Sequence, residues 1–317
     1  MGQATTHCFF ALHRRNADQR AAFLVLTFFL SAAAAGAAEN GVSVYPAGVE
    51  TILPGLMPPA GKTLFVEFNN FYQANGLMDG NGHSLIPGFH LRVAAVAPKL
   101  VHNWGVKALG GTLVSSIAVP FLYEHLTGPF GSVHKSGVGN PDLGILAVAY
   151  SRGAWHWWYG VDEYLPGAQY HQSDLLNIGQ HYFATAPEGA ITYLPRHGKN
   201  EFSAKLQYIV NAANPADQYH AGQELVGEYA AMQNLDKKLS VGVNGYYYRQ
   251  TTDDRQNGML VEDGNRGRAF AAGPEIQYHF GEVALILKYQ KEAWVQNRTA
   301  GNSFWFQIGV PLWRHEN

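Results

Sequence analysis

From Gly61 onward the chain is a series of segments in which apolar and polar residues alternate, each roughly ten residues long and bounded by Gly, Pro, Asn and Asp. In the stretch from Asn200 to Asn211, Phe202 and Leu206 share one parity, whereas Glu201 and Lys205 share the other. Successive residues of a strand point to opposite faces, so each segment has one apolar and one polar face. About twelve such segments predict an all-β, antiparallel protein.

The alternation predicts a closed barrel in a membrane rather than a soluble sandwich. Downstream of Ala38 no apolar run approaches the length of a membrane helix, yet 47% of the residues are hydrophobic, 13% are aromatic and only 15% are charged. A barrel with an apolar outside and a polar lumen has this composition, and it would account for the mean hydropathy of -0.15. We therefore expect a transmembrane antiparallel β-barrel of about 12 strands.

Connections of different length are expected to alternate along the chain, as they do in outer-membrane barrels. Long ones are predicted near 74–86, 122–141, 166–176, 212–220, 252–267 and 292–302, and short ones near 102–105, 151–154, 195–199, 234–237 and 281. This order predicts an outer-membrane protein of a Gram-negative cell with both termini in the periplasm.

The N-terminal part does not share the strand pattern and predicts two further segments. Arginines, an apolar run and small residues in 1–38 predict a signal peptide that is cleaved after Ala37 or Ala38. Cys8, the single cysteine, would be removed with it. Residues 39–60 contain Pro46 and Pro54 among other prolines and are expected to form a periplasmic segment or a plug, ahead of a barrel over 61–317.

No motif predicts catalysis, a cofactor or a resident metal, and a net charge of -2 gives no basis for nucleic-acid binding. His90, His156 and His279 have lumen-facing parity, but no zinc-ligand spacing occurs. The acidic residues of one predicted loop could hold calcium or be solvated: Asp253, Asp254, Glu262 and Asp263.

Side chains expected to line the lumen are the candidate ligand contacts. Aromatic and charged residues of inward parity make up this set: Phe65, Glu67, Arg92, Trp158, Asp162, Tyr164, Glu224, Glu228, Tyr246, Tyr248 and Glu275. Charges inside a narrow barrel either pair with one another or select a ligand. Trp155 and Trp157 have outward parity and are expected in an interfacial aromatic girdle.

Six regions of the chain contain distinctive stretches: GVGNPDLG from Gly137, YLPGAQY from Tyr164, YHAGQE from Tyr219, GYYYRQTTDD from Gly245, GNRGRAFAAGPEIQYHFG from Gly264, and KYQKE, NR and GNSFWFQIGVPL near the end. These stretches resemble the outer-membrane family named for the meta pathway of phenol degradation, which includes sphingosine-inducible outer-membrane proteins. The resemblance covers nearly the whole mature chain and implies a transporter of aromatic or other hydrophobic compounds, with no catalytic residues. Asn140 stands where many relatives are expected to have an acid, and Asp142 follows.

The leading hypothesis is a barrel for passive uptake or binding of phenol-type compounds or long-chain lipids. One alternative is a lipid-modifying enzyme that uses Ser132, His134 and Glu124 at the outer rim, and another is a structural or surface-binding barrel with a plugged lumen. The expected partners are the lipid bilayer with its lipopolysaccharide, the barrel-assembly machinery and a hydrophobic ligand.

Overall fold

The structure, a computed structural model, describes residues 41–167 and 169–313. The predicted signal peptide, 1–38, lies outside these residues. No helix in the described ranges is both long and apolar enough to cross a membrane.

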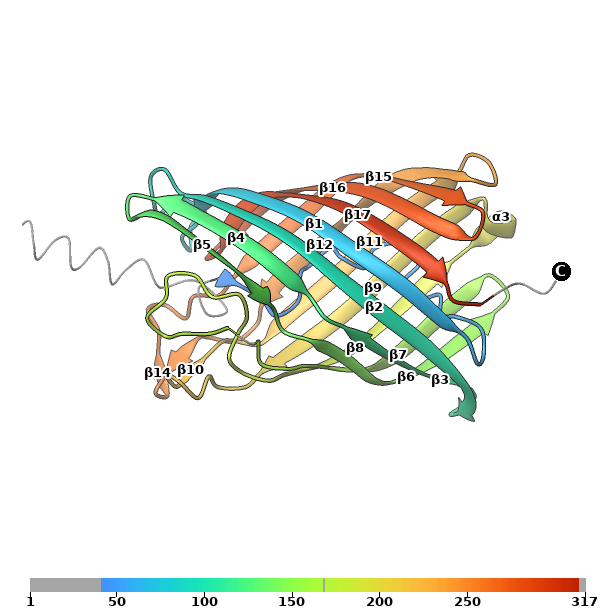
Figure 1. Ribbon diagram of the computed structural model, residues 1–317, viewed down its shortest axis with the longest axis horizontal. Coiled ribbons are helices and arrows are strands. Elements are labelled where there is room, and N and C mark those ends of the chain that lie inside the picture. The colour runs from blue at the N-terminus through green and yellow to red at the C-terminus, as the bar shows by residue number, and fades with distance from the viewer. Residues whose placement is uncertain (1–40, 168, 314–317) are drawn as a thin grey trace, which may run out of the picture. The chain divides into compact units, whose positions relative to one another are not determined.

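Within residues 41–313, β-strands form almost all of the regular structure (Figure 1). The strands of the main sheet are β1 (Thr63–Leu77), β2 (His90–Ala108), β3 (Gly111–Ala118), β4 (Phe121–Gly128), β5 (Gly131–Val138), β6 (Asp142–Arg152), β7 (Trp155–Tyr164), β8 (Ala184–Tyr193), β9 (Asn200–Asn211), β11 (Glu224–Asn234), β12 (Leu239–Gln250), β15 (Arg268–Phe280), β16 (Val283–Gln296) and β17 (Thr299–Pro311). Short pieces are the helix α3 (Pro195–Gly198) and the strands β10 (Tyr219–His220), β13 (Arg255–Gln256) and β14 (Met259–Leu260).

The main sheet closes on itself, as the alternation predicts. The first strand, β1, pairs with both β2 and the last strand, β17, so the order β1-β17-β16-β15-β12-β11-β9-β8-β7-β6-β3-β2 returns to β1. All of these pairs are antiparallel. The described residues thus form a closed antiparallel barrel of 12 strands, which confirms the predicted fold class.

One part of the wall departs from this regular order, because the long strand β2 pairs with β3 along one half and with β4 along the other. The break between β3 and β4 falls at Val119 and Pro120, and the break between β5 and β6 includes Pro141. Proline lacks the N–H that a ladder needs, which accounts for a break at these two places. The outer edge of β5 pairs with no strand of the described chain, and the connection at 165–183 contacts it through an ion pair between Lys135 and Asp174 at 2.7 Å.

Most of the predicted connections are confirmed. The short turns at 153–154, 194–199, 235–238 and 281–282 define one end of the barrel, here called the turn end, and the connections at 78–89, 165–183, 212–223 and 251–267 define the opposite loop end. Three predictions are wrong. Strand β2 continues through 102–105 and turns at 109–110, the stretch 122–141 contains β4 and β5, and β16 and β17 meet in a tight turn at 297–298.

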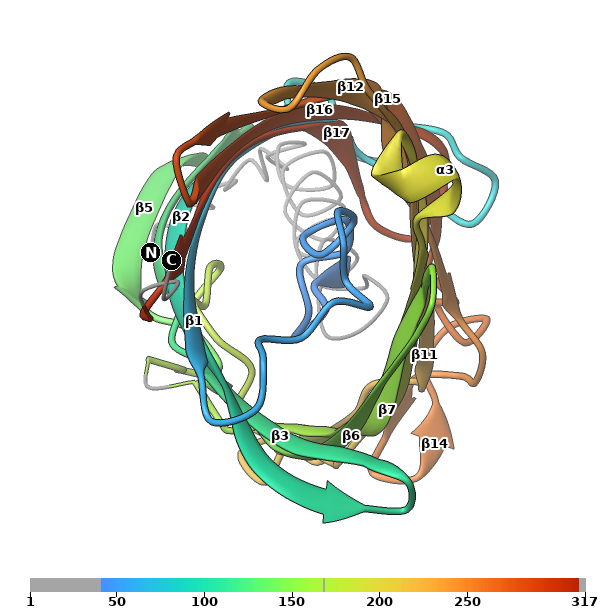
Figure 2. The same ribbon diagram turned by 90° about the vertical axis from the view of Figure 1, so that its right-hand side faces the viewer.

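The segment that precedes β1 runs through the barrel from one end to the other. Gly41 lies against Asn297 and Arg298 at the loop end, whereas Gly61 donates to the carbonyl of Asn103 near the turn end. Figure 2, a view along the barrel, shows this segment in blue inside the ring of strands. It is therefore a lumen plug. The first described residues lie at the loop end, whereas β17 ends at the turn end. That both termini are periplasmic stays a prediction.

Candidate functional site: the plug and the lumen

The structure places most of the predicted lumen residues inside the barrel. All of the correctly placed side chains are at most 6% exposed: Trp158, Asp162, Tyr164, Glu224, Glu228, Tyr246, Tyr248 and Glu275. They come from β7, β11, β12 and β15. Whether they contact a ligand stays a prediction.

Three predicted lumen residues point outward instead, and these predictions are wrong. Phe65 and Glu67 alternate with Leu64 and Val66, which line an internal cavity. On β2 the buried ion-pairing Lys99 fixes the odd positions as inward, which places Arg92 on the outer face, as well as His90. On β1 the assignment fails because the inward side chains face an apolar cavity and are themselves apolar, so polarity does not mark the lumen side.

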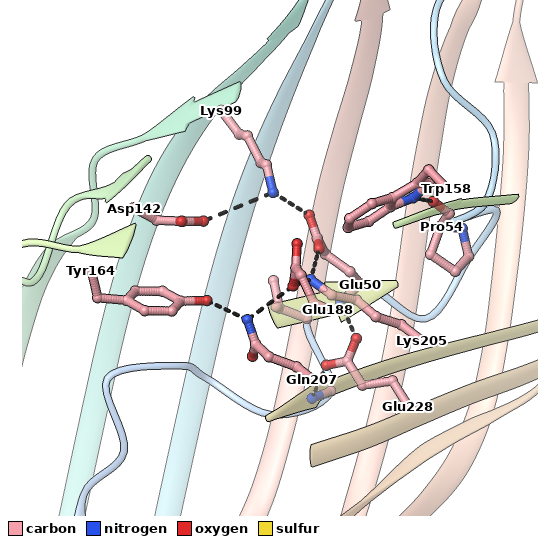
Figure 3. A network of polar contacts seen from close by, with 12 residues as sticks. Glu50, Pro54, Lys99, Asp142, Trp158, Tyr164, Glu188, Lys205, Gln207 and Glu228 are labelled. Atoms are coloured by element: carbon pink, nitrogen blue, oxygen red, sulfur yellow. Dashed lines mark hydrogen bonds and ion pairs between the residues drawn. The ribbon is translucent and has the colours of Figure 1, made fainter. Parts of the chain in front are cut away.

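Glu50 of the plug forms ion pairs with two lysines that point into the lumen from two distant strands of the wall (Figure 3). Its carboxylate lies 2.7 Å from Nζ of Lys99 on β2 and 2.5 Å from Nζ of Lys205 on β9. Lys205 also contacts Glu188 on β8 at 2.8 Å, and both of these side chains are almost completely buried. Burial disfavours the charged form of Glu50, but the two ammonium groups outweigh burial and hold the pKa of this carboxyl well below its ordinary range. We call Glu50, Lys99, Lys205 and Glu188 the plug latch.

Backbone groups of the plug are satisfied by wall side chains on both sides of the latch. Glu228 accepts hydrogen bonds from the N–H groups of Gly48 and Glu50. Lys288 on β16 is 1% exposed and donates to the carbonyl oxygens of Gly48 and Val49, each at 2.7 Å. An irregular segment inside a barrel has no ladder of its own, so these side chains replace one.

Closer to the turn end the plug borders a cavity of about 680 Å³. Trp158 fixes one side of it by donating from Nε1 to the carbonyl of Pro54 at 2.6 Å. The lining is predominantly aliphatic and aromatic on both the plug and the wall, with the charged groups of the latch at the inner end: Ile52, Leu53, Leu56, Met57, Leu64, Val66, Phe68, Val101, Val114, Trp158, Glu50, Lys99 and Glu188. Small-molecule sites are typically pockets of this size that are mostly apolar and carry a few charged groups.

At the loop end the lumen is filled by a cluster of tyrosines around Arg298. Its guanidinium lies 3.9 Å from the ring centroid of Tyr248. Glu292 accepts hydrogen bonds from the hydroxyls of Tyr72 and Tyr246 beside it. Together with the buried plug residues Val44, Tyr45 and Val49, this cluster blocks the lumen at the loop end. The cavity is therefore open toward the turn end and does not continue through the barrel.

The hypothetical catalytic and calcium-binding groups do not assemble in the structure. In the β4–β5 hairpin Glu124 pairs across from Lys135, whereas His134 pairs across from His125, so the glutamate and His134 lie on opposite faces. Ser132 contacts His125 at 2.8 Å instead. Asp253 pairs with Arg266 at 2.7 Å, and the described residues contain no group of three or more His, Cys, Asp or Glu that could hold a metal ion.

Sequence reasoning missed the plug latch. Glu50 lies 49 residues from Lys99 and 155 residues from Lys205, so no local spacing links them. The available signal was a lysine at an inward position of β2 and another at an inward position of β9, because a charge inside a barrel requires a partner.

Comparison with known proteins places this arrangement among outer-membrane barrels. A COG4313 outer membrane channel from Pseudomonas putida F1 superposes with a TM-score of 0.71 at 16% sequence identity, over 85% of this chain and 100% of that chain. A FadL homologue from Pseudomonas aeruginosa gives a TM-score of 0.42 at 7% identity, over 88% and 97% of the two chains. The first of these shows a shared fold.

A search of curated protein sequences gave no match. The sequence model of the family described as "Putative MetA-pathway of phenol degradation" matches residues 74–308, which include most of the barrel wall. The resemblance noted in the sequence is thereby confirmed, and the chain belongs to this family of outer-membrane β-barrels.

Proposed function

We propose that this barrel binds hydrophobic, aromatic small molecules and lets them pass across the outer membrane passively, with the plug closing the lumen in the state described. The observation that carries the proposal is the apolar cavity of about 680 Å³ between the plug and β1, β2, β3 and β7. Its aliphatic walls and the indole of Trp158 offer a phenol-type solute a shielded surface. The charged latch at its inner end offers a partner for one hydroxyl.

The proposal makes the plug the movable part. Strands of the wall are held by backbone ladders, whereas residues 41–60 are held to the wall through side chains such as Glu228 and Lys288. An apolar solute that enters the loop end needs the plug to shift before it can reach the cavity. The name of the family supports phenol-type cargo, and the cavity supports any apolar molecule of that size.

A direct test uses neighbouring residues on opposite faces of β1. Val66 lines the cavity, and Phe65 faces outward. We expect Val66→Trp to fill part of the cavity and weaken binding of 1-naphthol to the purified barrel about 10-fold, whereas Phe65→Trp leaves it unchanged. Equal affinity in both variants would place the ligand elsewhere. In cells, uptake of labelled naphthol that is the same with and without the protein contradicts a transport role.

A second candidate function, a structural barrel with a permanently plugged lumen, is favoured by the buried ion pairs between plug and wall. The two candidates differ in one measurement. If apolar solutes pass only when residues 41–62 are free to move, covalent attachment of the plug to β9 abolishes uptake. If the barrel is structural, that attachment leaves the uptake of apolar solutes unchanged.

A further inference from the structure

An aromatic groove lies on the outer surface of the barrel near the loop end. It has a volume of about 310 Å³ and is lined by Tyr247 on β12, Arg268 and Phe270 on β15, and Trp294 on β16. Tyr246 and Tyr248 are buried in the lumen, so Tyr247 between them faces outward. The rings of Phe270 and Trp294 lie 5.2 Å apart, and Trp294 is 71% exposed.

A β-bulge in β16 builds this groove. Arg268 pairs with Gln296 and Phe270 pairs with Ala293, so β16 has one residue more than β15 over this stretch. Trp294 has a φ of 53°, a left-handed conformation that disfavours a bulky side chain. The next residue, Val295, is buried in the lumen core, whereas the indole of Trp294 is directed outward over Phe270. Bulges that redirect a side chain at this cost occur at functional sites.

Positive charges gather at the same place without acidic partners. Arg249 and Arg268 are direct cross-strand neighbours on the outer face, an arrangement in which like charges repel. Lys291 on β16 is exposed on that face as well. In the described chain no outward position of β11, β12, β15, β16 or β17 is Asp or Glu, and the nearby Asp253 pairs with Arg266. Binding of an anion from outside the chain would relieve this repulsion.

The arginines and the aromatic rings follow one another along the strands in the order of the charged headgroup and the acyl chains of a lipid. Along β12 Arg249 lies closer to the loop end than Tyr247, and along β15 Arg268 lies closer to it than Phe270. Aromatic rings suit the boundary between headgroups and acyl chains. Long loops of outer-membrane barrels face the outside, so this end lies in the outer leaflet.

We propose that this groove is a binding site for lipopolysaccharide, in which a phosphate of the lipid A headgroup lies between Arg249 and Arg268 and an acyl chain lies along Phe270 and Trp294. Arginine pairs bind phosphate through charge-assisted hydrogen bonds. The site lies on the outer wall, apart from the cavity inside the barrel, and it does not depend on the transport proposal.

The test measures binding of three lipids to the purified full-length barrel in detergent: bisphosphorylated lipid A, dephosphorylated lipid A and phosphatidylglycerol. We expect bisphosphorylated lipid A to bind most tightly. The variant Arg249→Gln/Arg268→Gln should raise its Kd about 100-fold, since each charge-assisted contact contributes about 10-fold. The control Lys107→Gln/Arg152→Gln removes two exposed charges near the turn end and should leave the Kd unchanged.

A further variant separates the rings from the charges. Trp294→Ala should weaken both forms of lipid A by a similar factor, because it removes contact with the acyl chain alone. Equal affinity for phosphatidylglycerol and lipid A, or an unchanged Kd in the double arginine variant, would overturn the proposal. So would a dimer of the barrel that Trp294→Ala dissociates, since a second copy would then be the occupant. Heat-modifiable migration on a gel checks that every variant is folded.

Discussion

Replacing Glu50 by glutamine should release the plug, because this side chain connects it to two strands on opposite sides of the lumen. Glutamine has nearly the same shape but no charge, so Lys99 and Lys205 lose their shared partner. Lys205 keeps Glu188 at 2.8 Å, whereas the next acid near Lys99, Asp142, lies 3.9 Å away. Breaking a buried ion pair from one side costs about 3–5 kcal/mol. With Lys205 still paired, we expect the lower end, about 3 kcal/mol.

A loss of about 3 kcal/mol raises the ratio of open to closed plug about 150-fold. The assay is the conductance of single barrels in a planar bilayer. We expect wild-type barrels to remain closed most of the time and Glu50→Gln barrels to show frequent large openings. Glu67→Gln is the matched control, since Glu67 lies on the outer face of the same region, where its carboxylate accepts a hydrogen bond from Asn69. A folded Glu50→Gln barrel with wild-type conductance would refute the latch.

The remaining predictions concern the same plug and the wall around it. Lys288→Met should expose the plug to thiol labelling at a cysteine placed at Val44, while Lys291→Met on the outer face should not. The reason is that Thr51 Oγ1 loses the Lys288 donor and the carbonyl oxygens of Gly48 and Val49 keep only Gln290 and Gln307. Gly273→Ala should lower the free energy of unfolding in urea by about 1–3 kcal/mol, since a Cβ there would lie 1.9 Å from the carbonyl oxygen of Tyr289. Gly227→Ala, where the nearest atom is 3.7 Å away, should change little. The lowered pKa of Glu50 means that its ion pairs persist as the pH falls and are lost only below the ordinary range. The difference in conductance between wild-type and Glu50→Gln barrels should therefore persist from about pH 8 to about pH 5; loss of that difference with a midpoint near the ordinary glutamate value contradicts this.

The sequence predicts the wall well because strand alternation is a local property. Trp158, Asp162 and Tyr164 on β7 are assigned to the lumen correctly, since they share one parity of that strand and successive residues of a strand point to opposite faces. The same reasoning fails on β1, where Val66 and Phe68 face an apolar cavity and Glu67 faces outward. Polarity indicates the lumen only where the lumen contains water or charge.

The plug could be suspected from its prolines but not placed. Its position depends on Glu50 meeting lysines that are distant in sequence and on glutamates such as Glu228 that bind backbone groups. A proline-rich segment carries no repeat that would reveal these partners. The path of the plug, and with it the direction in which the chain enters the barrel, therefore required the structure.

That path has a consequence for biogenesis. The plug runs from the loop end to the turn end and continues directly into β1, and β1 is one side of the seam that closes against β17. A segment already enclosed by a finished ring would have to be threaded through it. The seam therefore closes around the plug, so the last strand to be synthesised seals a segment from the beginning of the chain inside the wall. Any tag fused immediately before Gly41 would leave the barrel at its loop end.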